Sequence, residues 1–99
     1  MEIKKNVTDE TLELAVSGRL DTNTAPKLEE TIQGSIAGIT TLILDFGELE
    51  YVSSAGLRVL LSTQKTMNKQ QGKMIVRNVI SEIMDVFDIT GFSDILTIE

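Results

Sequence analysis

The stretch "LEYVSSAGLRVLL", from Leu49 to Leu61, lies where the sequence pattern changes from strand to helix. The apolar residues before it form a continuous run, and those in its second half recur at helical spacing. Two serines and a glycine stand between the two patterns. Either serine can cap the helix with its side-chain oxygen. Either can also carry a phosphate, because a helix start presents unpaired N–H groups and the positive end of the helix dipole.

The segments around this stretch predict a buried strand and a long helix. The run Thr40–Phe46 is β-branched and apolar without alternation, which is typical of a strand buried on both faces. The residues between it and the serines, 47–52 (GELEYV), are interpreted as a short acidic loop. The helix after the serines is expected to stop at Gly72. Its apolar stripe consists of Leu57, Leu60, Leu61, Gln64 and Met67.

The N-terminal part predicts a hairpin and a shorter helix. Residues 2–7 (EIKKNV) and 12–18 (LELAVSG) read as two strands, joined by the turn-like segment Thr8–Thr11. A loop is expected over 18–23, and Thr24 is the predicted N-cap of the helix that follows. The apolar stripe of that helix is Leu28, Ile32 and Ile36.

The C-terminal part predicts a strand over Lys73–Val79, a helix capped by Ser81 and stopped by Gly91, and a last strand within Asp94–Glu99. Strands that alternate with helices indicate an α/β sheet covered by helices through right-handed crossovers. With 99 residues, we expect a single domain over 1–99.

Composition excludes several kinds of chemistry. The chain has no histidine and no cysteine, which rules out a Ser-His-Asp arrangement, a thiolate nucleophile and a cysteine-based zinc site. The formal net charge of −6 argues against nucleic-acid binding. No apolar run reaches the length of a membrane span and no signal peptide is visible, so we expect no membrane insertion and a cytoplasmic location.

Two local features allow alternative interpretations. Gly56, in the first helical turn, lets another backbone or a ligand approach closely. It could equally reflect packing against the chain's own segment 18–21 (GRLD). The carboxylates Asp21, Asp45, Glu48 and Glu50 could gather at one sheet edge, as a site for Mg²⁺ or a nucleotide or as a solvated acidic rim; Asp21 could also cap the helix near Thr24.

Five segments, in order along nearly the whole chain, resemble the STAS domain family of anti-sigma factor antagonists. "VSSAGLRVLL" is similar to the family signature of Asp-Ser, a Ser, Thr or Ala, then Gly-Leu before an apolar helix. "VSGRLDTNTAPKLEE" resembles the family's Gly-x-Leu-Asp segment. The other three are "LILDFGELEYV", "GKMIVRNV" and "VFDITGFSDILTI". The resemblance implies a STAS-type α/β fold, with a small mixed β-sheet packed with helices.

The resemblance also implies a bacterial partner-switching protein that is not an enzyme and needs no cofactor. The unphosphorylated form is expected to bind an anti-sigma factor that is also a GHKL-type serine kinase, which releases the sigma factor. Phosphorylation at the helix start ends the complex, and a separate serine phosphatase restores it.

Carried onto this sequence, the phosphorylated residue is Ser54, with Ser53 as the second choice. Ser53 stands where the family usually has aspartate, and Asp21 matches the acidic residue of the Gly-x-Leu-Asp segment. The expected partner-binding surface comprises Asp21, Ser53, Ser54, Ala55, Gly56, Leu57 and Arg58.

Two other functions stay open at this point. STAS-like domains also serve as subunits in lipid-transport or transporter-regulating assemblies that have no sigma factor. Nucleotide binding or slow hydrolysis through Asp21 and the serine turn is the enzymatic alternative, although no glycine-rich phosphate loop supports it.

Overall fold

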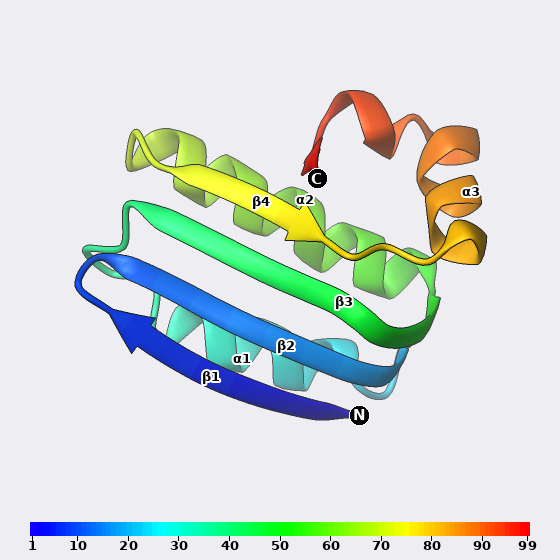
Figure 1. Ribbon diagram of the computed structural model, residues 1–99, viewed down its shortest axis with the longest axis horizontal. Coiled ribbons are helices and arrows are strands. Elements are labelled where there is room, and N and C mark those ends of the chain that lie inside the picture. The colour runs from blue at the N-terminus through cyan, green and yellow to red at the C-terminus, as the bar shows by residue number, and fades with distance from the viewer.

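A computed structural model describes all of residues 1–99 and shows strands alternating with helices (Figure 1). The strands lie side by side in chain order, β1-β2-β3-β4-β5. β1 is antiparallel to β2, and the other neighbouring pairs are parallel, so the sheet is mixed. The elements are β1 Glu2–Thr8, β2 Thr11–Leu20, α1 Ala25–Gln33, β3 Thr41–Val52, α2 Ser54–Lys69, β4 Lys73–Arg77, α3 Ser81–Thr90, the 3-10 helix η1 Phe92–Asp94 and β5 Thr97–Ile98.

The helices α1 and α2 both lie behind the sheet in the view of Figure 1, and the front face is left without a helix. Successive parallel strands step in one direction across the sheet, and right-handed crossovers that all step the same way place their helices on the same side. β3 accordingly alternates between buried residues and the half-buried Thr41, Ile43 and Asp45. The prediction that this strand is buried on both faces is therefore wrong.

β3 also continues through the segment 47–52 that was expected to be a loop. Its pairing with β2 shifts twice, between Ala15 and Ser17 and again between Gly18 and Arg19, and each shift adds one extra residue to β3. Such bulges break the two-residue period of a strand. The buried residues here are consequently three apart, at Phe46, Leu49 and Val52.

The ends of β2 and the C-terminal end of α1 differ slightly from the expected ones. β2 extends to Leu20, two residues beyond its expected end at Gly18. Thr24 occupies the N-cap position of α1, but its side chain makes no capping hydrogen bond. α1 ends at Gln33, so Ile36 reaches the core from the loop that follows and not from the helix.

Gly72, which was expected to stop α2, has a different role at the end of this helix. The left-handed residue after this helix is Gln71, with φ 60°, and not Gly72. Gly72 donates its N–H to the carbonyl of Met67 at 2.8 Å. A Cβ at Gly72 would lie 2.6 Å from Met67 Cε and 2.8 Å from the carbonyl oxygen of Thr40. Glycine is needed there for space.

Helix α3 packs at the end of the sheet where β3 finishes, whereas β5 pairs with β4 at the edge of the sheet (Figure 1). The N-cap of α3 is Ile80, so the prediction that Ser81 caps this helix is wrong; the Ser81 hydroxyl bonds instead to Glu82 Oε1 at 2.9 Å. Gly91 ends α3 in the left-handed conformation, with φ 81°, as predicted. The last strand is shorter than expected and follows η1.

One apolar core joins the sheet to the helices. Of the predicted α2 stripe, Leu57, Leu60 and Met67 are buried, whereas Leu61 and Gln64 are only half-buried. Val59 and Thr63 complete the buried face of α2. None of the helices combines the length and the apolar composition that crossing a membrane would require.

Candidate functional site

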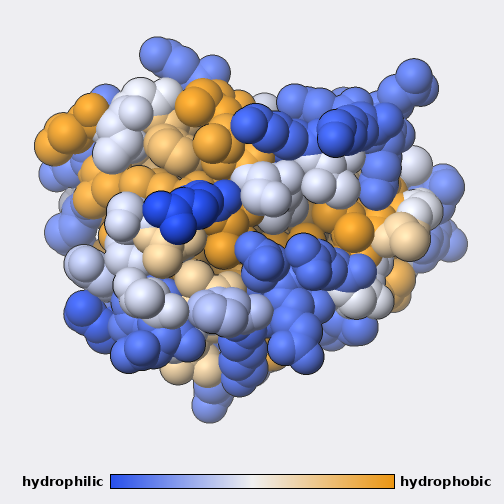
Figure 2. Space-filling model, turned by 180° about the vertical axis from the view of Figure 1, so that it is seen from behind, coloured by the Kyte–Doolittle hydropathy of each residue, from blue (hydrophilic) through white to orange (hydrophobic).

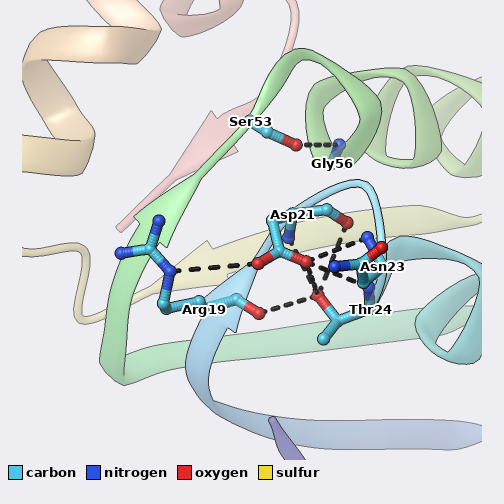
Figure 3. A network of polar contacts seen from close by, with 6 residues as sticks. All are labelled: Arg19, Asp21, Asn23, Thr24, Ser53 and Gly56. Carbon is cyan, nitrogen blue, oxygen red and sulfur yellow. Dashed lines mark hydrogen bonds and ion pairs between the residues drawn. The ribbon is translucent and has the colours of Figure 1, made fainter.

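The serine turn lies beside the end of the neighbouring strand. Leu20 and Val52 are paired at the carboxyl ends of β2 and β3, and the N–H of Ser53 donates to the carbonyl of Leu20 at 2.8 Å. Carboxyl ends of parallel strands collect functional loops in α/β sheets. The pairing brings Asp21, which follows Leu20, close to the start of α2 (Figure 3).

Ser53 is the residue that caps α2. Its backbone is extended, with φ −96° and ψ 175°, and its Oγ accepts a hydrogen bond from the N–H of Gly56 at 3.3 Å. The first backbone hydrogen bond of the helix runs from the N–H of Leu57 to the Ser53 carbonyl at 2.9 Å. Of the two serines, Ser53 is therefore the one that caps the helix.

Ser54 is the first residue of α2, and its side chain is exposed. Its hydroxyl takes part in none of the side-chain hydrogen bonds of the structure. The first N–H groups of a helix have no partner within it. The N–H of Ser53 donates to the carbonyl of Leu20, and the N–H of Gly56 donates to Ser53 Oγ. The N–H groups of Ser54 and Ala55 therefore remain available to an anion held at this position.

Gly56 lets the helix start pack tightly on the sheet. A Cβ at this residue would lie 2.7 Å from Leu20 Cγ and 2.9 Å from Val52 Cγ2. The interpretation of Gly56 as packing against the segment 18–21 is thus the correct one. Leu57 is only 8% exposed. Gly56 and Leu57, two of the residues expected to bind the partner, are thus both buried, whereas Ser54 and Arg58 are exposed.

Asp21 organises the loop that leads into α1. Its Oδ1 accepts hydrogen bonds from the N–H groups of Asn23 at 3.0 Å and Thr24 at 3.1 Å, as Figure 3 shows. The Thr24 hydroxyl oxygen in turn accepts the Asp21 N–H at 2.8 Å. Arg19 Nε lies 3.8 Å from Asp21 Oδ2, and its guanidinium stacks over the Tyr51 ring at 4.1 Å.

These contacts lower the pKa of Asp21. Desolvation is the largest single influence and acts in the opposite direction, because it disfavours the charged carboxylate. The hydrogen bonds from Thr24 and Asn23, together with the positive charge of Arg19, outweigh it. Asp21 is therefore an anion held in a fixed orientation next to the start of α2.

The surface around Ser54 includes Ala55, which is half-buried, and Arg58, which is exposed. Arg58 lines a shallow hollow of about 180 Å³ between the starts of α1 and α2. The face that carries these helices mixes polar and apolar side chains, and in Figure 2 its largest apolar areas lie toward the α3 end. Ile89 of α3 is 86% exposed. Hydropathy by itself does not single out the serine turn.

Two further cations lie on the same face of α2 as Arg58, and the predicted partner-binding surface does not include them. Lys65 and Lys69 follow at helical spacing and are exposed, and together with Arg58 they line a second hollow of about 300 Å³. α2 contains no acidic residue. The combination of helical spacing and a helix without acids is the signal that would have found them.

The four carboxylates considered as a cluster do not form one. Asp45, Glu48 and Glu50 line a hollow of about 430 Å³ that Asp21 does not reach. Asp45 Oδ1 accepts hydrogen bonds from the Gly47 N–H at 2.9 Å and from Asn78 Nδ2 at 3.1 Å. No three acidic side chains come together in a group that could hold a metal ion.

Comparisons with known proteins agree with this architecture. A family model described as STAS domain matches residues 2–99. The chain is 31% identical over 100 residues to the anti-sigma-B factor antagonist of Listeria monocytogenes, covering 100% of this chain and 87% of the relative. It is 30% identical over 98 residues to the anti-sigma-B factor antagonist of Bacillus subtilis, covering 99% and 88%.

Solved structures show the same fold. The anti-sigma factor antagonist SpoIIAA in its unphosphorylated form is 23% identical, with a TM-score of 0.80 over 99% of this chain and 87% of that chain. SpoIIAA in its phosphorylated form is also 23% identical, with a TM-score of 0.78 over 99% and 91%. The family model and the relatives together show that the chain belongs to the STAS domain family and, within it, to the anti-sigma factor antagonists.

Proposed function

We propose that this protein binds an anti-sigma factor and thereby releases a sigma factor, and that phosphorylation of Ser54 ends this binding. The observation that carries the proposal is the exposed, unbonded hydroxyl of Ser54 at the start of α2 in an anti-sigma factor antagonist. The relatives at 30% identity or above carry that name, which favours this function over a subunit of a transporter assembly.

The proposed docking surface is the Ser54 turn together with the exposed residues beside it. Ser53, Ser54 and Ala55 present the turn, Arg58 extends it along α2, and Asp21 borders it at the end of β2. Gly56 and Leu57 support the surface from below. This arrangement places a cation on the same helix and an oriented anion at the neighbouring strand end, so a partner would be selected by charge as well as by shape.

Phosphorylation would change this surface strongly. The partner kinase, an anti-sigma factor of the GHKL type in this proposal, transfers the γ-phosphoryl group of ATP to Ser54 Oγ, while the hydroxyl proton leaves and ADP is released. The phosphoserine then carries about −1.5 to −2 charge and three acceptor oxygens. Bulk, repulsion from acidic groups and the desolvation of a dianion would all oppose docking.

The protein itself is the acceptor of the phosphate and supplies no catalytic group in this scheme. A separate serine phosphatase would hydrolyse the phosphoserine with water and return the free hydroxyl. Ser54 suits both enzymes, because its side chain is exposed and its hydroxyl makes no hydrogen bond that would have to break.

The test is phosphorylation by candidate kinases with ATP, followed by mapping of the modified residue by mass spectrometry. We expect a single phosphate on Ser54, loss of modification in Ser54→Ala, and retained modification in the matched variant Ser53→Ala. Binding of the unmodified protein to the same kinase is measured in parallel by calorimetry. Unchanged phosphorylation of Ser54→Ala would contradict the assignment of this serine.

A further inference from the structure

Arg58 lies one helical turn after Ser54 on the exposed side of α2. The two residues are four apart in the sequence, and both are exposed. Side chains four apart share one face of a helix and lie close enough to interact. An anion that precedes a cation by four residues is the favourable order for such a pair, because it also suits the helix dipole.

Arg58 has no other ionic partner. The two ion pairs of the structure join Arg19 to Asp21 and Arg77 to Glu99. α2 contains no acidic residue that could compete within the helix. Glu29 of α1 lines the same hollow as Arg58 without forming an ion pair with it. The guanidinium is therefore free to bind a new anion on its own helix.

We propose that Arg58 binds the phosphate of phosphorylated Ser54 within the same molecule. The inference rests on the proposed function only in requiring a phosphate on Ser54. The guanidinium would donate hydrogen bonds to the phosphate oxygens from the side of the helix, while the N–H groups of Ser54 and Ala55 face them at the helix start. Phosphorylation then has a second consequence, because it removes a cation from the docking surface.

This intramolecular pairing distinguishes Arg58 from the other cations of α2. Lys65 is eleven residues beyond Ser54, which corresponds to about 16 Å along the helix axis. Arg19, on β2, is already paired with Asp21 and stacked on Tyr51. Arg58 alone combines the right spacing with a free guanidinium.

The test measures the phosphate directly and needs no partner protein. Phosphoserine is incorporated at position 54 during translation, and the pKa of its phosphate is followed by ³¹P NMR titration. We expect this pKa to be about 0.3 pH unit lower in the protein with Arg58 than in Arg58→Gln, as for an exposed ion pair one turn apart. The difference should shrink at high salt.

Two further variants separate pairing from a structural effect. Lys65→Gln removes a cation from the same helix and should leave the phosphate pKa unchanged. Arg58→Lys keeps the charge and should retain most of the lowered pKa, since the attraction is mainly ionic. In ¹⁵N spectra, the Arg58 Nε–H signal should move when Ser54 is phosphorylated, whereas that of Arg19 should not.

Equal phosphate pKa values in the protein with Arg58 and in Arg58→Gln would overturn the inference. If Lys65→Gln raised the phosphate pKa as much as Arg58→Gln, the inference would also be overturned. The effect would then come from the overall positive charge of α2 and not from a pairing with Arg58. Since the phosphoserine is incorporated without a kinase, either result is independent of whether a kinase modifies Ser54. Failure of the proposed function would appear only in the kinase experiment.

Discussion

The substitution Gly56→Ala tests how the start of α2 is held in place. A Cβ at this position would lie 2.7 Å and 3.0 Å from the Cγ and Cδ2 atoms of Leu20, and 2.9 Å from Val52 Cγ2. Leu20 is fully buried and Val52 is 5% exposed, so both close contacts fall on side chains packed in the core. The helix start itself would have to move away from the sheet.

The expected free energy change is the difference between two effects. Alanine favours the helix over glycine by about 0.5–1 kcal/mol. Overpacking of a well-filled core destabilises by about 1–3 kcal/mol. We expect Gly56→Ala to lower the free energy of unfolding by about 1 kcal/mol, which corresponds to a fall in Tm of about 4–8 °C for a domain of this size. Thermal and urea unfolding would measure the change.

Gly34→Ala is the matched control at the end of α1. Its φ is −73°, and a Cβ there would approach no closer than 3.4 Å to the Glu30 carbonyl oxygen. The same substitution should therefore be neutral or stabilise by up to about 1 kcal/mol, because it restricts the unfolded chain. If Gly56→Ala proves as stable as the unmodified protein or more so, the close approach of α2 to Leu20 does not require glycine, and the reasoning is refuted.

Three further expectations concern caps, charge and core. Ser53→Ala should destabilise by about 1 kcal/mol through loss of the helix cap, whereas Ser54→Ala should stay within about 0.5 kcal/mol in thermal unfolding; equal losses would contradict the division of roles. The pKa of Asp21 is lowered in the folded state, so its charge stabilises the fold above the ordinary carboxyl range and this contribution disappears as the pH falls through the folded pKa. Urea unfolding should accordingly show Asp21→Asn to be less stable at neutral pH, with a difference that disappears in acid; a constant difference would rule out the charge as its cause. Leu60→Ala should lower the free energy of unfolding by about 2–5 kcal/mol, since this side chain is fully buried. Leu61→Ala should lower it clearly less in the same assay, because Leu61 is only half-buried.

Much of the site follows from local patterns. Two serines before an apolar helical spacing predict a helix start, and the structure begins α2 at Ser54 with Ser53 as its cap. The sequence could not show which serine caps, because both satisfy the local rule. That choice depends on the pairing of β2 with β3, which ties the N–H of Ser53 to the carbonyl of Leu20.

The segment 47–52 was misread as a loop for a similar reason. The residues that become buried there, Leu49 and Val52, are three apart, which does not match the two-residue period of a strand. The pattern makes sense only when two extra residues are inserted opposite β2, and the bulges arise from that pairing. Arg58 and Lys65, in contrast, could have been grouped from their spacing on α2 alone.

The sequence by itself determined the alternation of strands and helices, the presence of a helix after the two serines and the absence of histidine and cysteine chemistry, because each depends on residues that are near one another in the chain or on composition. Only the tertiary structure decided that α1 and α2 share one face of the sheet, since that depends on the order of the strands. It also decided that Gly56 serves close packing, because the atoms that exclude a side chain belong to Leu20 and Val52 of two paired strands.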